Sequence, residues 1–183
     1  MLTDLPDFAA WRFVDGVDGF EVVYPTRRRL RGHSCGVEDG RPHAVRYEIE
    51  LDERWRTRRA RVWNDTVDGP GAIVLASDGE GAWTLDGAPA PHLYGLLDVD
   101  LEASACTNTV PLHRMDFPSD AVVPAAAVYV RALDLSVTRL DQTYRRLDEH
   151  RFAYTAEAAF TAVLEYDAAG LILDYPGIAR RFA

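Results

Sequence analysis

Residues 44–52 read AVRYEIELD. Apolar side chains occupy every odd position from Val45 to Leu51, and charged side chains occupy every even position from Arg46 to Asp52. This period of two predicts a β-strand with one buried face and one solvated face. It is the clearest periodicity in the chain, and it indicates an antiparallel sheet.

The segments on either side extend the same pattern. The turn signal Glu38-Asp39-Gly40 predicts a hairpin that pairs residues 28–37 with this strand, and residues 57–64 return as the next strand. Further strands, each bounded by Gly, Asp or Pro, are predicted at 72–77, 82–86, 109–117, 125–130, 152–156, 159–166 and 171–175, with a loop at 87–97. Roughly ten antiparallel strands in one domain, residues 1–183, cannot lie flat and are expected to curl into a barrel, roll or sandwich.

Two segments permit a helix. Apolar residues between Leu133 and Leu147 recur at helical spacing, but Val and Thr in the same segment favour strands, and we predict one long strand. Residues 100–105 permit a single helical turn that Asp98 or Asp100 would cap. The predicted class is therefore all-β with one or two short helical turns.

The composition excludes several functions. The net charge is −9 and the pI is about 5.0, which disfavours binding to nucleic acid or to an anionic membrane. The sequence has no run of 18 apolar residues that could cross a membrane, and we recognise no signal peptide. We therefore expect a soluble cytoplasmic protein. Cys35 and Cys106 form neither a disulfide framework nor a metal-binding motif, and no cofactor fingerprint occurs, so we expect no metal and no cofactor.

Polar residues that are hard to interpret as surface gather in residues 98–114, DVDLEASACTNTVPLHR. On a strand, Asp98 and Asp100 would share one face with Cα atoms about 6.6 Å apart, within reach of a cation, sugar hydroxyls or acid–base chemistry. Capping of a turn is the favoured alternative. Asn108 and Thr109 could likewise either fix a turn or hold a sugar.

Arg114 and the aromatic residues complete the candidate site. If residues 110–114 are extended, Arg114 shares a face with Val110 and Leu112, and a buried guanidinium needs an anionic partner; Asp98, Asp100 and Asp174 are the candidates. The aromatic residues are expected mostly in the core. Their apolar rings with polar edges would also suit an amphipathic ligand, and the candidates for a pocket are Trp55, Tyr144 and Tyr175.

Several motifs in order carry a resemblance to a known family. They are Tyr47 with Asp52, Trp55, Thr57 and Arg58; residues 78–83 (DGEGAW); 98–101 (DVDL) with 107–114 (TNTVPLHR); 142–147 (QTYRRL); 152–154 (FAY); and Tyr166-Asp167 through Gly170 to 174–177 (DYPG). Over most of its length the chain resembles the bacterial glycolipid-binding family, first described as a domain of unknown function. The resemblance implies an antiparallel β-roll or unclosed barrel around an apolar interior, similar in shape to bacterial lipoprotein carriers.

Two functional hypotheses follow. The favoured one is a non-catalytic binding module that encloses an apolar or amphipathic small molecule, glycolipid-like by the resemblance, in a cavity of roughly a few hundred Å³. Its site residues would be Asp98, Asp100, Asn108, Thr109, Arg114, Tyr144, Tyr175 and Trp55. The alternative is a small hydrolase or lyase, which requires Asp98, Asp100 and Arg114 to converge on an open cleft.

Overall fold

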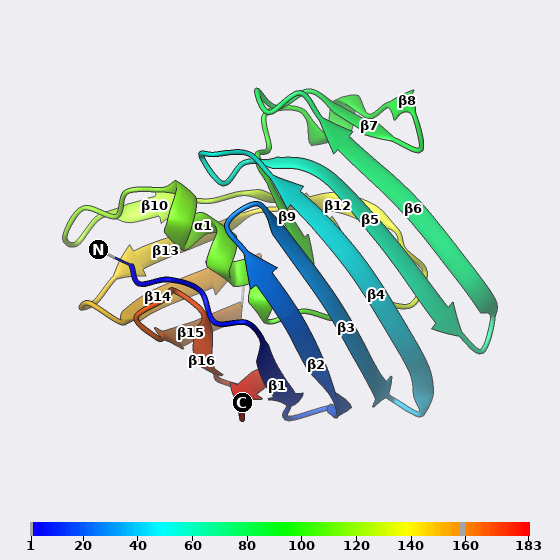
Figure 1. Ribbon diagram of the computed structural model, residues 1–183, viewed down its shortest axis with the longest axis horizontal. Coiled ribbons are helices and arrows are strands. Elements are labelled where there is room, and N and C mark those ends of the chain that lie inside the picture. Colours follow the sequence, from blue (N-terminus) through cyan, green and yellow to red (C-terminus); the bar gives the residue numbers. More distant parts are fainter. Residues whose placement is uncertain (1, 158–159) are drawn as a thin grey trace.

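The computed structural model describes residues 2–157 and 160–183, and their fold is a large curled antiparallel sheet (Figure 1). Within these residues, fourteen strands follow one another in the order β10-β13-β14-β15-β16-β17-β1-β2-β3-β4-β5-β6-β7-β8, and three more form a second sheet. The large sheet does not close, because β10 and β8 remain its two edges. The predicted all-β fold, an unclosed antiparallel roll, is confirmed.

The N-terminal half of the roll is a series of hairpins. Residues 44–52 lie in β4, where Val45, Tyr47, Ile49 and Leu51 are buried as the alternation predicts. Strands β1 and β2, which continue the sheet beyond β3, were not predicted from the sequence. The strands of this half are β1 (Ala9–Phe13), β2 (Val17–Thr26), β3 (Arg29–Glu38), β4 (Arg41–Leu51), β5 (Thr57–Thr66), β6 (Gly69–Ser77), β7 (Trp83–Leu85) and β8 (Ala88–Pro89).

The C-terminal half continues the same sheet with shorter strands. Its last strand pairs with β1, with Trp11 opposite Arg181, and this pairing joins the two ends of the chain into one curved wall. The strands are β10 (Val122–Pro124), β13 (Gln142–Arg146), β14 (Arg151–Ala156), β15 (Phe160–Tyr166), β16 (Ile172–Tyr175) and β17 (Ala179–Arg181). Ala159, the predicted start of β15, lies outside the described residues.

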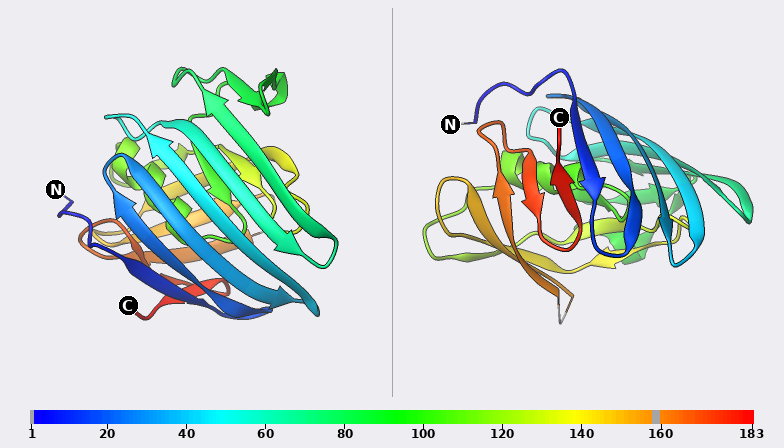
Figure 2. Two further views of the ribbon diagram at one scale, coloured as in Figure 1. Left: turned by 45° about the vertical axis from the view of Figure 1, so that its right-hand side comes forward. Right: turned by 90° about the horizontal axis from the view of Figure 1, so that it is seen from below.

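Residues 98–114, which we call the central segment, lie between the halves in the chain and inside the roll. Figure 2 shows this segment enclosed by strands of both halves, with the helix near the middle of the view from below. Strand β9 (Asp98–Leu101) pairs in parallel with β11 (Ala127–Val130), which pairs with β12 (Val137–Leu140). A 3₁₀ turn, η2 (Cys106–Asn108), leads into the helix α1 (Thr109–Arg114). Nearly every side chain from Asp98 to Pro111 is buried.

The structure corrects the prediction for residues 109–117, because the segment begins with a helix instead of a strand. Pro111 is tolerated there because the N–H groups of the first helical turn have no partner within the helix. The predicted helical turn at residues 100–105 is also wrong, since Asp98 and Asp100 belong to β9 and the 3₁₀ turn starts only at Cys106. The two aspartates are therefore strand residues and cap no helix.

Residues 133–147 are largely extended, but they do not form one strand. The chain leaves the small sheet after β12 and enters the large sheet at β13, and Asp141 separates the two. The predicted loop at 87–97 contains β8 and a 3₁₀ turn, η1 (Pro91–Leu93). Among the described residues, no helix has the length and apolar character needed to cross a membrane.

Candidate functional site

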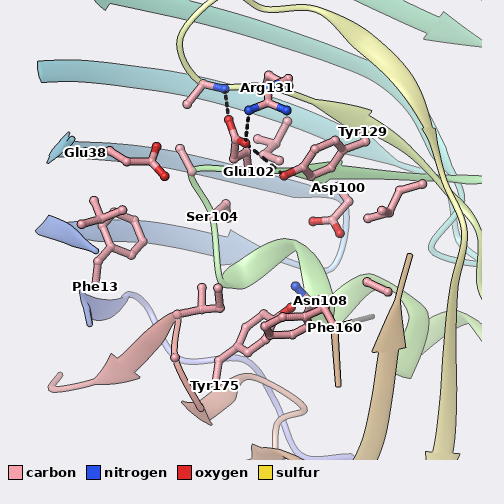
Figure 3. Close-up of a pocket in the computed structure, with 18 of the residues that line it drawn as sticks. Phe13, Glu38, Asp100, Glu102, Ser104, Asn108, Tyr129, Arg131, Phe160 and Tyr175 are labelled. Atoms are coloured by element: carbon pink, nitrogen blue, oxygen red, sulfur yellow. Dashed lines mark hydrogen bonds and ion pairs between the residues drawn. The ribbon is translucent and has the colours of Figure 1, made fainter. Parts of the chain in front are cut away.

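A cavity of about 370 Å³ lies between the central segment and the inner wall of the roll (Figure 3). Its size agrees with the predicted few hundred Å³. Five aromatic rings contribute to its lining, from Phe13, Tyr129, Tyr154, Phe160 and Tyr175. Polar side chains of the central segment face the same space from the opposite side, and three of them, Asp100, Ser104 and Asn108, belong to buried residues.

Asp100 of β9 is the buried carboxylate of the cavity lining. Its carboxylate accepts a hydrogen bond from the Thr107 hydroxyl at 2.6 Å, and the residue is 7% exposed. Burial raises the pKa of Asp100 to about 6; the Thr107 hydrogen bond lowers the pKa, and the nearby charge of Asp98 raises it. Asp100 thus has no cation to balance it among the described residues.

Asn108 supplies a neutral polar group beside Asp100. Its side-chain oxygen accepts a hydrogen bond from the Tyr144 hydroxyl at 2.7 Å. That bond orients the amide, and Figure 3 shows the amide nitrogen pointing toward the Asp100 side of the cavity. The Asp100 carboxylate and the Asn108 amide therefore offer an acceptor and a donor to one ligand, and a sugar hydroxyl can bond to both kinds of group.

A buried carboxylate that contacts the central segment was not identified from the sequence. Glu21 of β2 is completely buried and accepts hydrogen bonds from the Tyr47 hydroxyl (2.6 Å), the Ser104 hydroxyl (2.5 Å) and the backbone N–H groups of Ala105 and Cys106 (2.9 and 3.3 Å). Burial raises its pKa to about 7, and the four hydrogen bonds oppose that rise. Because Ser104 lines the cavity, Glu21 fixes the loop that carries the site.

Tyr47 reaches Glu21 because β3 has a glycine between them. Gly32 lies opposite both Val23 of β2 and Tyr47 of β4. A Cβ atom at Gly32 would lie 2.2 Å from Cζ of the Tyr47 ring, so only glycine leaves room for the ring to cross β3. The signal in the sequence is the position of Glu21, in phase with the buried Val23.

Asp98 and Arg114 form a separate, closed pair. The guanidinium donates two hydrogen bonds to the Asp98 carboxylate, at 2.7 and 2.8 Å, and the Asp98 side chain is only 2% exposed. Burial raises the pKa of Asp98 above its usual value, and the Arg114 charge acts against that shift. The predicted partnership is confirmed, although Arg114 reaches Asp98 from a helix and not from a strand.

Of the eight predicted site residues, Asp100, Asn108 and Tyr175 line the cavity. Tyr144 is completely buried behind Asn108, and Thr109 is buried in α1. Trp55 stacks on His113 with ring centroids 3.7 Å apart, at a different site from the cavity. Asp98 and Arg114 also lie outside the lining, so the three groups required for the hydrolase or lyase hypothesis do not converge on this cleft.

In residues 2–157 and 160–183, no three His, Cys, Asp or Glu side chains gather as candidate metal ligands. The cavity instead combines aromatic rings, one buried carboxylate and one amide. This lining can hold a small molecule through apolar contacts and a few oriented hydrogen bonds.

Comparisons with known proteins agree with this architecture. A family described as "Putative glycolipid-binding" matches residues 9–181. The crystal structure of a DUF1089 family protein from Pseudomonas aeruginosa is similar, with a TM-score of 0.85 and 28% sequence identity over 100% of this chain and 96% of that chain. No curated protein matches the chain. Because the family match extends over nearly its whole length, the chain belongs to the family described as "Putative glycolipid-binding".

Proposed function

We propose that the protein binds an amphipathic small molecule, such as a glycolipid, in the cavity of about 370 Å³ between the roll and its central segment. The observation that carries this proposal is the composition of the cavity lining. Asp100 and Asn108 present polar atoms to the same space as aromatic and aliphatic side chains. A ligand with a hydroxylated head group and an apolar tail matches both kinds of surface.

The family description and the residues agree on the class of ligand. The family is named for glycolipid binding, and the wall offers a hydrogen-bond donor and an acceptor side by side. We assign ligand contact to Asp100, Asn108 and Tyr175. To Asp98, Thr109, Arg114, Tyr144 and Trp55 we assign support of the fold around the cavity. The acidic net charge argues against nucleic acid as a partner, and the two free cysteines suit a reducing compartment such as the cytoplasm.

Filling the cavity tests the proposal. Ala156 lines the cavity from β14, and Ala153 lies on the opposite face of the same strand. Calorimetric titration with decyl glucoside, below its micelle-forming concentration, should show binding to the wild type and to Ala153→Phe. Ala156→Phe should reduce the affinity by about tenfold or more, because the new ring occupies the ligand's space. Equal binding by Ala156→Phe and Ala153→Phe would place the ligand elsewhere.

A further inference from the structure

The charge of the cavity lining is strongly one-sided. Carboxylates come from Asp15, Glu38, Asp100, Glu102 and Glu157, whereas the lining contains one arginine, Arg131. The Arg131 guanidinium pairs with Glu102 at 3.3 Å. Among the described residues, the other four carboxylates have no ion-pair partner. A concave surface lined by one sign of charge concentrates the field inside it, so a ligand enters a negative potential.

Asp100 places one of these carboxylates on the central segment, at a buried position of the cavity lining. One carboxylate oxygen accepts from Thr107. The backbone N–H of Leu101 also lowers the pKa of this carboxyl group, but no cation pairs with it among the described residues, and Figure 3 shows the group directed into the cavity. The nearest carboxylate along the strand, Asp98, has Arg114 as its counterion, so the protein balances one aspartate and leaves the other open.

The aromatic groups around Asp100 also favour a cation. Tyr129 lies beside Asp100 in register on the parallel strand β11, and Tyr154 and Tyr175 line the same cavity. Burial raises the pKa of each of these tyrosines, so all three stay neutral. Neutral aromatic rings attract cations through the negative electrostatic potential of their faces.

We propose that this cavity takes an amphiphile whose head group is an ammonium, with Asp100 as its counterion, and that it discriminates against anionic lipids. The inference rests on the proposed function and narrows its ligand class. Long-chain amines and lipids that carry an amino sugar share this chemistry. Fatty acids and anionic phospholipids would place a second negative charge beside an unbalanced carboxylate, and the low polarity of the cavity makes that repulsion strong.

Calorimetric titration with a series of decyl amphiphiles at about pH 7, below micelle formation, tests the proposal. The probes are decylamine, decyl glucosaminide, decyl glucoside and decanoate. We expect decylamine to bind about tenfold or more tighter than decyl glucoside, and decanoate to bind weakest, because a hydrogen bond between charged groups is stronger than a neutral one. A tighter complex with decyl glucosaminide than with decylamine would identify the amino sugar as the source of the ammonium, and the reverse order would identify the long-chain amine.

Asp100→Asn is the decisive variant, because it keeps the shape of the side chain and removes the charge. It should weaken decylamine binding about tenfold or more and change decyl glucoside binding by less than about threefold. Glu165→Gln, which removes an exposed carboxylate of β15 outside the cavity lining, serves as the control and should change binding of every probe by less than about threefold. If decanoate binds as well as decylamine, or if Asp100→Asn weakens all probes equally, the ammonium proposal fails while the binding function stands. If no probe binds the wild type, both fail.

Discussion

Asp98 and Asp100 are two residues apart on one strand, yet they have opposite surroundings. Asp98 is held by two hydrogen bonds from Arg114 and is shut off from the cavity. Asp100 accepts a hydrogen bond from the Thr107 hydroxyl, has no ion-pair partner among the described residues, and lines the cavity. A buried carboxylate with a matched cation stabilises a fold only as long as both partners remain, whereas one without a cation is destabilising and is available to a ligand. The first region is structural, and the second is the candidate binding site.

Breaking the Asp98–Arg114 pair should have the largest effect on stability. Arg114→Met leaves the Asp98 carboxylate buried and unpaired, and we expect the free energy of unfolding to fall by about 3–5 kcal/mol. Urea denaturation measures this change. The exposed pair of Arg180 with Asp174 is the control, and Arg180→Met should cost less than about 1 kcal/mol. Similar losses in the two variants would show that Arg114 is not the anchor of the central segment.

Removing the charge of Asp100 should have the opposite effect and raise the free energy of unfolding. Its pKa of about 6 in the folded protein exceeds the usual 3.8, so the folded state holds the proton more tightly and the fold loses stability as pH rises from about 4 to 6. Asp100→Asn removes that loss. The variant should therefore be more stable than the wild type by about 2–3 kcal/mol above pH 7 and nearly equal to it at pH 4.

The groups around Asp100 leave this interpretation clear. Asp98 is paired with Arg114, Thr107 does not titrate in this range, and the tyrosines that face the carboxylate have raised pKa values. His43 also lines the cavity, and burial lowers its pKa; because it is present in both proteins, the difference between them reports on Asp100. Urea denaturation of both proteins at pH 4, 6 and 8 makes the comparison. A destabilised Asp100→Asn at pH 8 would mean that the charge is needed by the fold and not kept for a ligand.

Tyr47→Phe should show how much the hydrogen bonds of Glu21 stabilise the loop that carries both regions. The change removes one of the four hydrogen bonds to a fully buried carboxylate and should cost about 1–3 kcal/mol in unfolding free energy. Tyr24 is exposed on β2, the strand of Glu21, so Tyr24→Phe should leave stability nearly unchanged. If Tyr47→Phe matches that control, Glu21 does not depend on this hydrogen bond.

The sheet was predictable because its strands follow simple alternation. In residues 45–51 each apolar side chain is buried and each charged one is exposed or half-buried, so local pattern and burial agree. Strand β2 breaks this agreement. Phe20 and Tyr24 are 47% and 44% exposed while Glu21 is buried, an inversion that depends on partners from β4 and the central segment. No local pattern encodes contacts with residues so distant in the chain.

The candidate site was predicted in part, for a similar reason. The polarity of residues 98–114 identified the segment, and Arg114 pairs with a predicted aspartate. The strand preference of Thr109 and Val110 suggested an extended chain, but burial inside the roll favours a helix that satisfies its own backbone hydrogen bonds. Which aspartate Arg114 pairs with is set by the position of this helix, and so is which aspartate remains open.

The central claim is that a ligand occupies the cavity beside Asp100. Native mass spectrometry of the protein purified gently from its own host tests this claim most directly. We predict an added mass on the wild type and on Ala153→Phe, and its loss from Ala156→Phe. A wild-type protein at the mass of the chain alone, or the same added mass on Ala156→Phe, would contradict the account.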